Sequence, residues 1–156
     1  MIVLTKTVVG AAAIALAASL AGAAFAGECP AEKRGTDVTK PGATASKEVS
    51  DVVLTSVDLA KEKVALSDHH LRLRKLEIKP GGIVAWHSHG DRPAIIYIIS
   101  GDIYEYASNC SVPILHKAGE VSREATGTAH WWQNTGSETV VLLSADILHD
   151  AKDHNM

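Results

Sequence analysis

The sequence predicts an all-β protein, a small antiparallel barrel made of one domain. From about residue 51 onward, β-branched and other apolar residues form short runs of about five to ten residues. Turn-forming pairs such as SG, AG and TG separate these runs, and little of the chain favours helix. Short strands that alternate with turns over nearly a hundred residues are typical of β-sandwiches and β-barrels.

The first 26 residues are predicted to be a cleavable signal peptide. Lys6 precedes an alanine-rich apolar run, and Ala24-Phe25-Ala26 matches the A-x-A pattern at which signal peptidase cuts. Cleavage there would leave Gly27 as the first residue. A retained transmembrane anchor is the alternative, but the apolar run is short. We therefore expect a bacterial protein of the periplasm or the medium, with no membrane association after cleavage.

Residues 27–50 are expected to form an extended, disordered arm, because they are rich in Pro, Gly, Thr, Ser and Lys and lack apolar periodicity. The barrel is expected to span 51–150, enough for one modest core. The net charge is −3, and basic residues cluster only in RLRK at 72–75, which alternates like a solvated strand face. This balance argues against a nucleic-acid or anionic-membrane partner.

The expected strands follow in order along the barrel region. The first two are VVLTSVDL at 52–59 and LRLRKLEI at 71–78, and a turn is expected at 79–82, KPGG. The others are expected at 83–89, 94–100, 102–107, 119–125 and 139–148. The final segment LHDAKDHNM favours at most one ragged helical turn.

Cys29 and Cys110 are the two cysteines, and both lie in loop-like surroundings. An even cysteine count in an exported protein favours a disulfide. Two unpaired thiols are the alternative. Neither cysteine has a base close to it in sequence, so the expected role is structural.

Two histidines, His87 and His89, lie in the expected strand 83–89. Residues i and i+2 of a strand point to the same face, about 7 Å apart, so both imidazoles enter one space. Imidazole is a good ligand for first-row divalent metals, and His130 in GTAHWWQN is the third candidate ligand. The pair alone is weak evidence, because many such pairs are exposed or merely packed.

Two segments around these histidines have characteristic spacings. The segment 81–101 is GGIVAWHSHGDRPAIIYIISG, and the segment 119–134 is GEVSREATGTAHWWQN. They resemble the two cupin motifs, G-x5-H-x-H-x4-E-x6-G and G-x5-P-x-G-x2-H-x3-N. The spacing agrees at Gly81, His87, His89, Gly101, Gly119, Gly127, His130 and Asn134. The resemblance covers about 71–148 and implies a single-domain jelly-roll barrel with a metal inside, similar to small quercetin-dioxygenase-like cupins.

Two positions depart from these motifs. Ala125 replaces the proline of the second motif, which affects only turn rigidity. Ala94 occupies the glutamate position of the first motif, so one usual metal ligand is missing. The resemblance then implies a divalent transition metal held by three neutral histidines, His87, His89 and His130. Three-histidine dioxygenases favour iron(II), while manganese, nickel, copper and zinc also accept imidazole ligands.

Such a centre would keep its full dipositive charge and about three open coordination positions. It would favour a bidentate anion such as an enolate, catecholate, hydroxy acid or thiolate. Two functions stay open: a non-haem dioxygenase acting on a small chelating organic anion, and a barrel that binds a small organic anion or a sugar without turning it over. If the missing glutamate leaves metal binding weak or absent, the protein would serve as such a binding barrel. A third alternative is a purely structural or sensory partner domain.

Trp132, Tyr97 and Arg92 are candidates for lining the substrate site. Strand alternation places Trp132 on the same face as His130. For Trp132 and Tyr97 the more ordinary role is core packing, and for Arg92 it is a surface ion pair.

Several other polar residues are expected to have structural roles. Asn134 is expected to fix the turn that follows His130 by hydrogen bonding to the backbone. Glu105 and Glu124 lie on strand-like runs, but positions facing the interior are disfavoured for both. The remaining histidines are expected to be solvated in turns or in the tail: His69, His70, His116, His149 and His154.

The apolar run AIIYIIS at 94–100 would be prone to association if it formed an exposed sheet edge. Pairing of two such edges predicts a homodimer.

Overall fold

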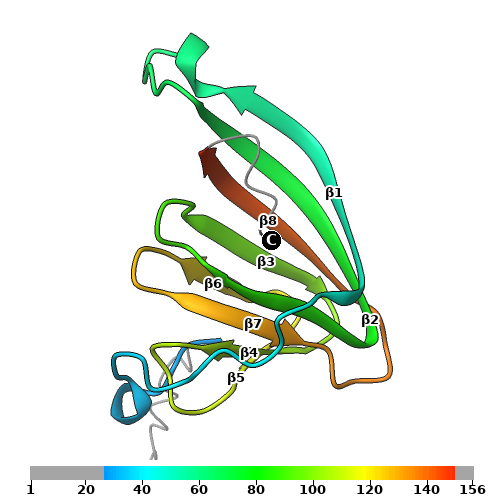
Figure 1. The fold of residues 1–156 in the computed structure, drawn as a ribbon. Helices are drawn as coiled ribbons and strands as arrows, with labels where there is room; N and C mark the ends of the chain where they lie inside the picture. The colour runs from blue at the N-terminus through cyan, green and yellow to red at the C-terminus, as the bar shows by residue number, and fades with distance from the viewer. Residues whose placement is uncertain (1–26, 150–156) are drawn as a thin grey trace, which may run out of the picture.

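The computed structural model describes residues 27–149 and confirms the predicted all-β barrel (Figure 1). The predicted signal peptide, 1–26, and the end of the chain, 150–156, lie outside the described residues. Two short 3-10 helices, η1 (Ala31–Lys33) and η2 (Leu59–Lys61), interrupt the β-structure. Within 27–149, no helix is long and apolar enough to cross a membrane.

The barrel strands lie close to the runs expected from sequence, with two short strands added. They are β1 (Lys47–Asp58), β2 (His69–Ser88), β3 (Ala94–Ser100), β4 (Ile103–Ala107), β5 (Ile114–His116), β6 (Val121–Glu124), β7 (Ala129–Gln133) and β8 (Val140–His149). They follow the order β5-β4-β7-β2-β8-β3-β6 in a nearly closed sheet, and β1 pairs with β2. The long strand β2 connects the two parts of the sheet, because its first half pairs with β1 and β8 and its second half pairs with β7.

The turn predicted at 79–82 is a bend inside β2, so the prediction of two separate strands was wrong. Gly81 has a φ of +73° at the bend. A Cβ atom on Gly82 would come within 2.6 Å of the Ile78 side chain, so the chain has no room there for a larger residue. Backbone hydrogen bonds of 2.9 and 3.0 Å join Asn134 to the two glycines, and pairing with β7 resumes directly after them. Turn-forming residues here change the strand direction without ending the sheet.

The core lies inside the barrel, where alternate residues of each strand point inward. The described apolar core consists of Leu76, Ile78, Val84, Ala94, Ile96, Ile98, Ile103, Trp132, Val140 and Leu142. Toward the end of β8 the interior becomes polar. There Asp146 accepts two hydrogen bonds from Arg72, of 3.0 and 2.7 Å, and lies 3.3 Å from Arg74. The buried carboxylate of Asp146 is therefore paired with two guanidinium groups.

Strand β3, the apolar run 94–100, is not a sheet edge. It pairs with β8 on one side and with β6 on the other. Its outward side chains Ile95, Tyr97 and Ile99 are exposed on the face of the sheet. The edge-pairing argument for a homodimer therefore does not hold, and the homodimer stays a prediction without that support.

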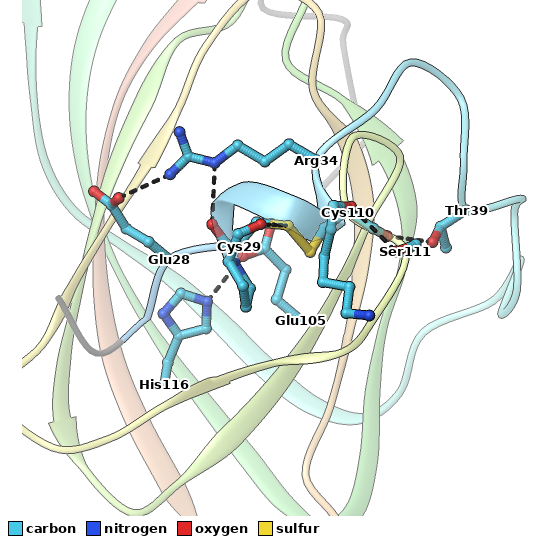
Figure 2. Close-up of a disulfide and its surroundings, with 10 residues drawn as sticks. Glu28, Cys29, Arg34, Thr39, Glu105, Cys110, Ser111 and His116 are labelled. Carbon is cyan, nitrogen blue, oxygen red and sulfur yellow. Dashed lines mark hydrogen bonds and ion pairs between the residues drawn. A yellow bond between two sulfur atoms is a disulfide. The ribbon is translucent and has the colours of Figure 1, made fainter. Parts of the chain in front are cut away.

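The segment that precedes β1 is tied to the barrel by a disulfide and by backbone hydrogen bonds (Figure 2). Cys29 and Cys110 form the predicted disulfide, with Cα atoms 5.7 Å apart. Close to it, the N–H of Gly35 donates to the carbonyl oxygen of Asn109 (3.0 Å). The last four residues of the predicted arm already belong to β1.

Asn134 is buried and holds the turn between β7 and β8, as the sequence predicts. Its Nδ2 donates to the carbonyl oxygens of Ile78 (2.9 Å) and Glu138 (2.8 Å), and its Oδ1 accepts from the N–H of Gly136 (2.9 Å). We expect Asn134→Ala to lower the free energy of unfolding by roughly 2–3 kcal/mol, because three hydrogen bonds are lost and buried backbone groups stay unpaired. Urea denaturation measures this loss. The exposed neighbour Thr135 provides the control, since Thr135→Ala should change stability by less than about 0.5 kcal/mol; equal stability of both variants would contradict the role of Asn134.

Candidate metal centre

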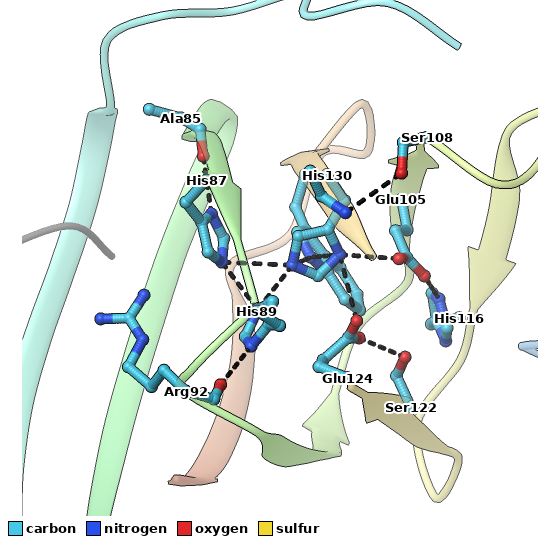
Figure 3. Close-up of polar contacts among 12 residues, drawn as sticks. Ala85, His87, His89, Arg92, Glu105, Ser108, His116, Ser122, Glu124 and His130 are labelled. Carbon is cyan, nitrogen blue, oxygen red and sulfur yellow. Dashed lines mark hydrogen bonds and ion pairs between the residues drawn. The ribbon is translucent and has the colours of Figure 1, made fainter. Parts of the chain in front are cut away.

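Three histidine side chains meet inside the barrel, and the sheet pairing explains why (Figure 3). His87 on β2 and His130 on β7 are directly opposite in the strand register. His89 lies just beyond β2 and stays beside β7 because its N–H donates to the carbonyl oxygen of Thr128 (2.9 Å). The Nε2 atom of His89 is 3.0 Å from each of the other two Nε2 atoms, which are 3.1 Å apart. The structure thus brings the three predicted ligands to one point.

The hydrogen bonds of the other ring nitrogens determine which nitrogen carries the proton. The Nδ1 atoms of His87 and His89 face carbonyl oxygens, those of Ala85 and Arg92, both at 2.8 Å. A carbonyl oxygen can only accept, so each Nδ1 must carry the proton. The Nδ1 of His130 faces a carboxylate oxygen of Glu105 at 2.7 Å. The Nε2 lone pairs of His87 and His89 therefore point toward the Nε2 of His130, as in metal-binding histidines.

The surroundings keep two of the three rings neutral. Burial, followed by the nearby His130, lowers the pKa of His87 to about 2 and that of His89 to about 4. A histidine whose pKa is lowered is uncharged at any pH well above that value. Both side chains are therefore in the form that binds metal at neutral pH.

The triangle of Nε2 atoms fits a divalent metal. Metal–imidazole bonds of about 2.1 Å separate two nitrogens by about 3.0 Å at right angles and by about 3.4 Å at tetrahedral angles. The observed separations of 3.0, 3.0 and 3.1 Å match the right-angle arrangement. Such a triangle is one face of an octahedron, which leaves three positions for other ligands.

The three histidines form one wall of a small cavity. Its volume is about 30 Å³, space for roughly two water molecules. The other lining residues are Leu76, Val84, Ile96, Trp132 and Leu142, together with the polar Arg74 and Ser144. A ligand in this cavity would meet imidazole nitrogens on one side and mostly apolar surface on the others.

Arg74 provides the cationic side chain of the cavity wall. Its side chain is only 8% exposed. Its NH1 donates to Asp51 (2.5 Å) and its NH2 to Ser144 Oγ (3.3 Å), while its Nε has no acceptor among the described residues. Its charge is paired with Asp51 and with Asp146, which lies 3.3 Å away, so Arg74 offers the cavity a hydrogen-bond donor and little net charge.

The other predicted lining residues have different positions. Trp132 lines the cavity, and its indole Nε1 lies 3.2 Å from Nδ1 of His130. Arg92 is buried and its carbonyl oxygen orients His89, but its guanidinium approaches Asp146 (4.0 Å) and is not part of the cavity wall. Tyr97 is 45% exposed on the outer face of the sheet, away from the cavity.

Ala94 begins β3 and lies opposite Glu124 in the register of β3 and β6. The neighbouring strand therefore carries a carboxyl group directly beside the position that lacks one. Glu124 reaches Nδ1 of His130, at 3.3 Å, and not the side where the three Nε2 atoms meet. Among the described residues, the group formed by these Nε2 atoms contains no carboxylate.

Sequence reasoning missed Glu105 and His116. Glu105 is buried on β4, and its two oxygens contact His130 Nδ1 (2.7 Å) and His116 Nε2 (2.8 Å). His116 is 0% exposed, so the prediction that it is solvated was wrong. Alternation along the run IYEYA places Glu105 on the same side as Ile103 and Ala107, and this signal could have identified it as an interior residue.

The two carboxyl groups beside His130 have opposite pKa shifts. Burial acts to raise the pKa of Glu105, but hydrogen bonds from His116 and His130 outweigh it and hold the pKa at about 2. Burial raises the pKa of Glu124. Burial acts to lower the pKa of His130, but Glu124 and Glu105 outweigh it, so that pKa is raised. The negative charge that favours a proton on His130 also favours a cation at its Nε2.

Comparison with known proteins identifies the family. A model of the cupin domain matches residues 74–146, the part that contains all three histidines. The oxalate-binding protein of Thermotoga maritima is 30% identical over 86 residues, which are 55% of this chain and 69% of that relative. The chain belongs to the cupin family, as the motif spacing predicts.

Solved structures show the same fold at low sequence identity. A predicted oxalate decarboxylase from Thermotoga maritima has a TM-score of 0.54 at 23% identity, covering 74% of this chain and 97% of that one. A conserved protein with a double-stranded β-helix domain from Klebsiella pneumoniae has a TM-score of 0.52 at 19% identity, covering 73% and 86%. The cupin domain of Cnp3 from Schizosaccharomyces pombe has a TM-score of 0.51 at 16% identity, covering 67% and 66%. These likenesses concern the fold.

Proposed function

We propose that this cupin binds a divalent transition metal through His87, His89 and His130 and captures a small chelating organic anion on that metal. The observation that carries the proposal is the meeting of three Nε2 atoms within 3.0–3.1 Å at the wall of a cavity. Iron(II) is the metal that the sequence resemblance favours. Mass spectrometry of metals in protein folded in the periplasm tests both the presence and the identity of the metal.

The charge of the centre supports an anionic ligand. Three neutral histidines leave the metal with its full charge of +2, and no glutamate ligand neutralises part of it. Arg74 lines the same cavity and could donate a hydrogen bond to such a ligand, although its charge is already paired with Asp51 and Asp146. The relative from Thermotoga maritima is named for binding oxalate, a two-carbon dianion that chelates metals.

The size of the cavity supports a small ligand. At about 30 Å³, the cavity would have to widen much further for the three rings of a flavonol than for a short acid. Among the ligand classes expected from the sequence, short hydroxy acids and carboxylates fit best. We therefore propose a small carboxylate that binds the metal through two oxygens.

Calorimetric titration with oxalate tests this function. We expect oxalate to bind the Mn²⁺- or Zn²⁺-loaded protein at least about tenfold more tightly than acetate, because acetate cannot form the same chelate ring. Metal-free protein is the control and should bind neither anion measurably. Equal oxalate binding with and without metal, or none in the loaded protein, would contradict the proposal.

A non-haem dioxygenase is the second candidate. It is favoured by the three coordination positions that a facial triangle of histidines leaves open. Bound iron(II) would supply oxygen activation, while the apolar wall with Trp132 would exclude water from the substrate. An oxygen electrode distinguishes the candidates: iron-loaded protein that consumes no oxygen with thiols, diketones or small hydroxy acids is a binding protein.

We further propose that the protein is exported and that signal peptidase cuts between Ala26 and Gly27. The disulfide is consistent with an oxidising compartment such as the periplasm. Intact-mass analysis of the periplasmic fraction should give a chain that begins at Gly27. A cytoplasmic chain that retains Met1 would contradict export.

A further inference from the structure

His130, Glu105 and His116 form a row of buried side chains (Figure 3). Glu105 and His116 lie on the side of the His130 ring that faces away from the cavity. His130 Nδ1 contacts Glu105 Oε1 at 2.7 Å, and Glu105 Oε2 contacts His116 Nε2 at 2.8 Å. All three side chains are at most 4% exposed. Both oxygens of the carboxylate are therefore occupied by histidine donors.

The strand register builds this row. Glu105 on β4 lies opposite Trp132 on β7, two residues after His130. His116 on β5 lies opposite Ile103, which faces inward together with Glu105. The ring of His116 also stacks on Trp132, with ring centres 4.6 Å apart. Glu105 is thus fixed from two strands, and its orientation does not depend on a flexible loop.

A buried carboxylate is costly unless its surroundings supply positive charge or donors. His116 and His130 supply the donors for Glu105. A metal on Nε2 of His130 would supply positive charge across the imidazole ring from Glu105. In metal sites such a carboxylate orients the imidazole and increases its basicity. Position 94, where a carboxylate would bind the metal directly, is alanine.

We propose that Glu105 is a positioning residue that supplies, through His130, the negative charge that is missing at position 94, and that His116 holds Glu105 in place. This inference rests on the proposed metal site. Glu105 would touch neither metal nor ligand. It would act by fixing the His130 proton on Nδ1 and by strengthening Nε2 as a donor to the metal.

Glu124 provides a matched comparison on the same ring. It is also buried, but it lies 3.3 Å from His130 Nδ1 and accepts a hydrogen bond from Ser122. A general effect of removing buried negative charge near the site would appear in both Glu105→Gln and Glu124→Gln. A positioning role of Glu105 would appear as a clearly larger loss in the first variant than in the second.

The test measures Zn²⁺ affinity by chelator competition. Glutamine has the shape of glutamate, and its amide can keep both hydrogen bonds if His116 adopts its other tautomer, so Glu105→Gln removes mainly the charge. We expect affinity to fall about 10- to 100-fold in Glu105→Gln, the range typical of outer-shell partners, and by a clearly smaller factor in Glu124→Gln, whose carboxyl group lies farther from Nδ1. Glu105→Asp keeps the negative charge, so its Zn²⁺ affinity should lie between that of wild type and that of Glu105→Gln. In the Zn²⁺ form, the NMR signal of the His130 Nδ1 proton should move upfield in Glu105→Gln, because a charged acceptor is replaced by a neutral one.

The outcomes separate this inference from the metal site itself. Wild-type protein that binds no metal would end the proposed function. Wild-type protein that binds Zn²⁺, with unchanged affinity and an unchanged His130 signal in Glu105→Gln, would overturn the role of Glu105 alone. If Glu105→Gln does not fold, His116→Gln decides: a loss of affinity supports the chain of contacts, and wild-type affinity overturns it.

Discussion

Replacing His130 with alanine is expected to reduce the affinity for divalent metal by roughly 100- to 1,000-fold. Structural zinc sites with four ligands bind with about 10–16 kcal/mol, or about 3–4 kcal/mol for each ligand, which corresponds to two to three orders of magnitude. His130 is the ligand whose loss should matter most. It contributes one of three nitrogens, and its Nδ1 is the contact that ties Glu105 to the site.

Metal analysis of purified protein and chelator competition measure this effect. His130→Ala also leaves Glu105 without one donor and will lower stability, so His87→Ala serves as the second variant, since His87 is only half-buried. Both variants should lose metal. His69→Ala is the control: His69 lies outside the site, with its ring centre 4.7 Å from that of His149, and its loss should leave metal content unchanged. Wild-type metal content in His130→Ala and His87→Ala would show that the three nitrogens do not form the site.

The three histidines could be predicted from sequence because their chemistry and their spacing are both local properties. Strand alternation places His87 and His89 on one face, and the resemblance to two cupin motifs adds His130. Once the two strands pair, the third ring has little freedom, since His130 lies directly opposite His87. A short motif is therefore sufficient to predict that the three rings meet.

The residues behind His130 could not be predicted in the same way. The positions of Glu105 and His116 depend on which strand becomes the neighbour of β7, and that is a property of the whole sheet. Charged residues on strands usually face water, so burial was disfavoured for Glu105. The paired contacts that make its burial tolerable come from residues 11 and 25 positions away.

The same dependence on strand partners that are distant in sequence explains the errors in the predicted fold. The segment 79–82 contains the residues of a tight turn, yet the neighbouring strands keep the chain in the sheet and the turn becomes a bend. The run 94–100 is apolar enough to suggest a hazardous edge, yet β6 and β8 cover both of its sides. In each case the pairing partners, which are distant in sequence, determined the outcome.

Removing the disulfide is expected to cause the largest loss of stability. The bond closes a loop with a sequence separation of 81 residues. Chain entropy in the unfolded state assigns such a cross-link about 4–5 kcal/mol, which corresponds to a fall in Tm of roughly 10–20 °C for a domain of this size. Around the bond, Cys110 is buried with Ala107 and Ile114, so the arm is attached to a packed cluster and not to a free loop.

Thermal unfolding followed by circular dichroism measures this loss. Cys29→Ala removes the cross-link while leaving the buried Cys110 side chain in place, so it separates the effect of the bond from that of packing. Wild-type protein in reducing agent should unfold at nearly the same temperature as Cys29→Ala, and reducing agent should have no effect on the variant. The arm also borders a cavity of about 540 Å³ that includes Glu105 and Glu124, whereas none of the three histidines of the candidate metal centre lines it. Metal affinity at 25 °C should therefore stay within about threefold of wild type. A variant that keeps the wild-type Tm would show that the disulfide does not stabilise the barrel, and one that loses metal while folded would show that the arm supports the site.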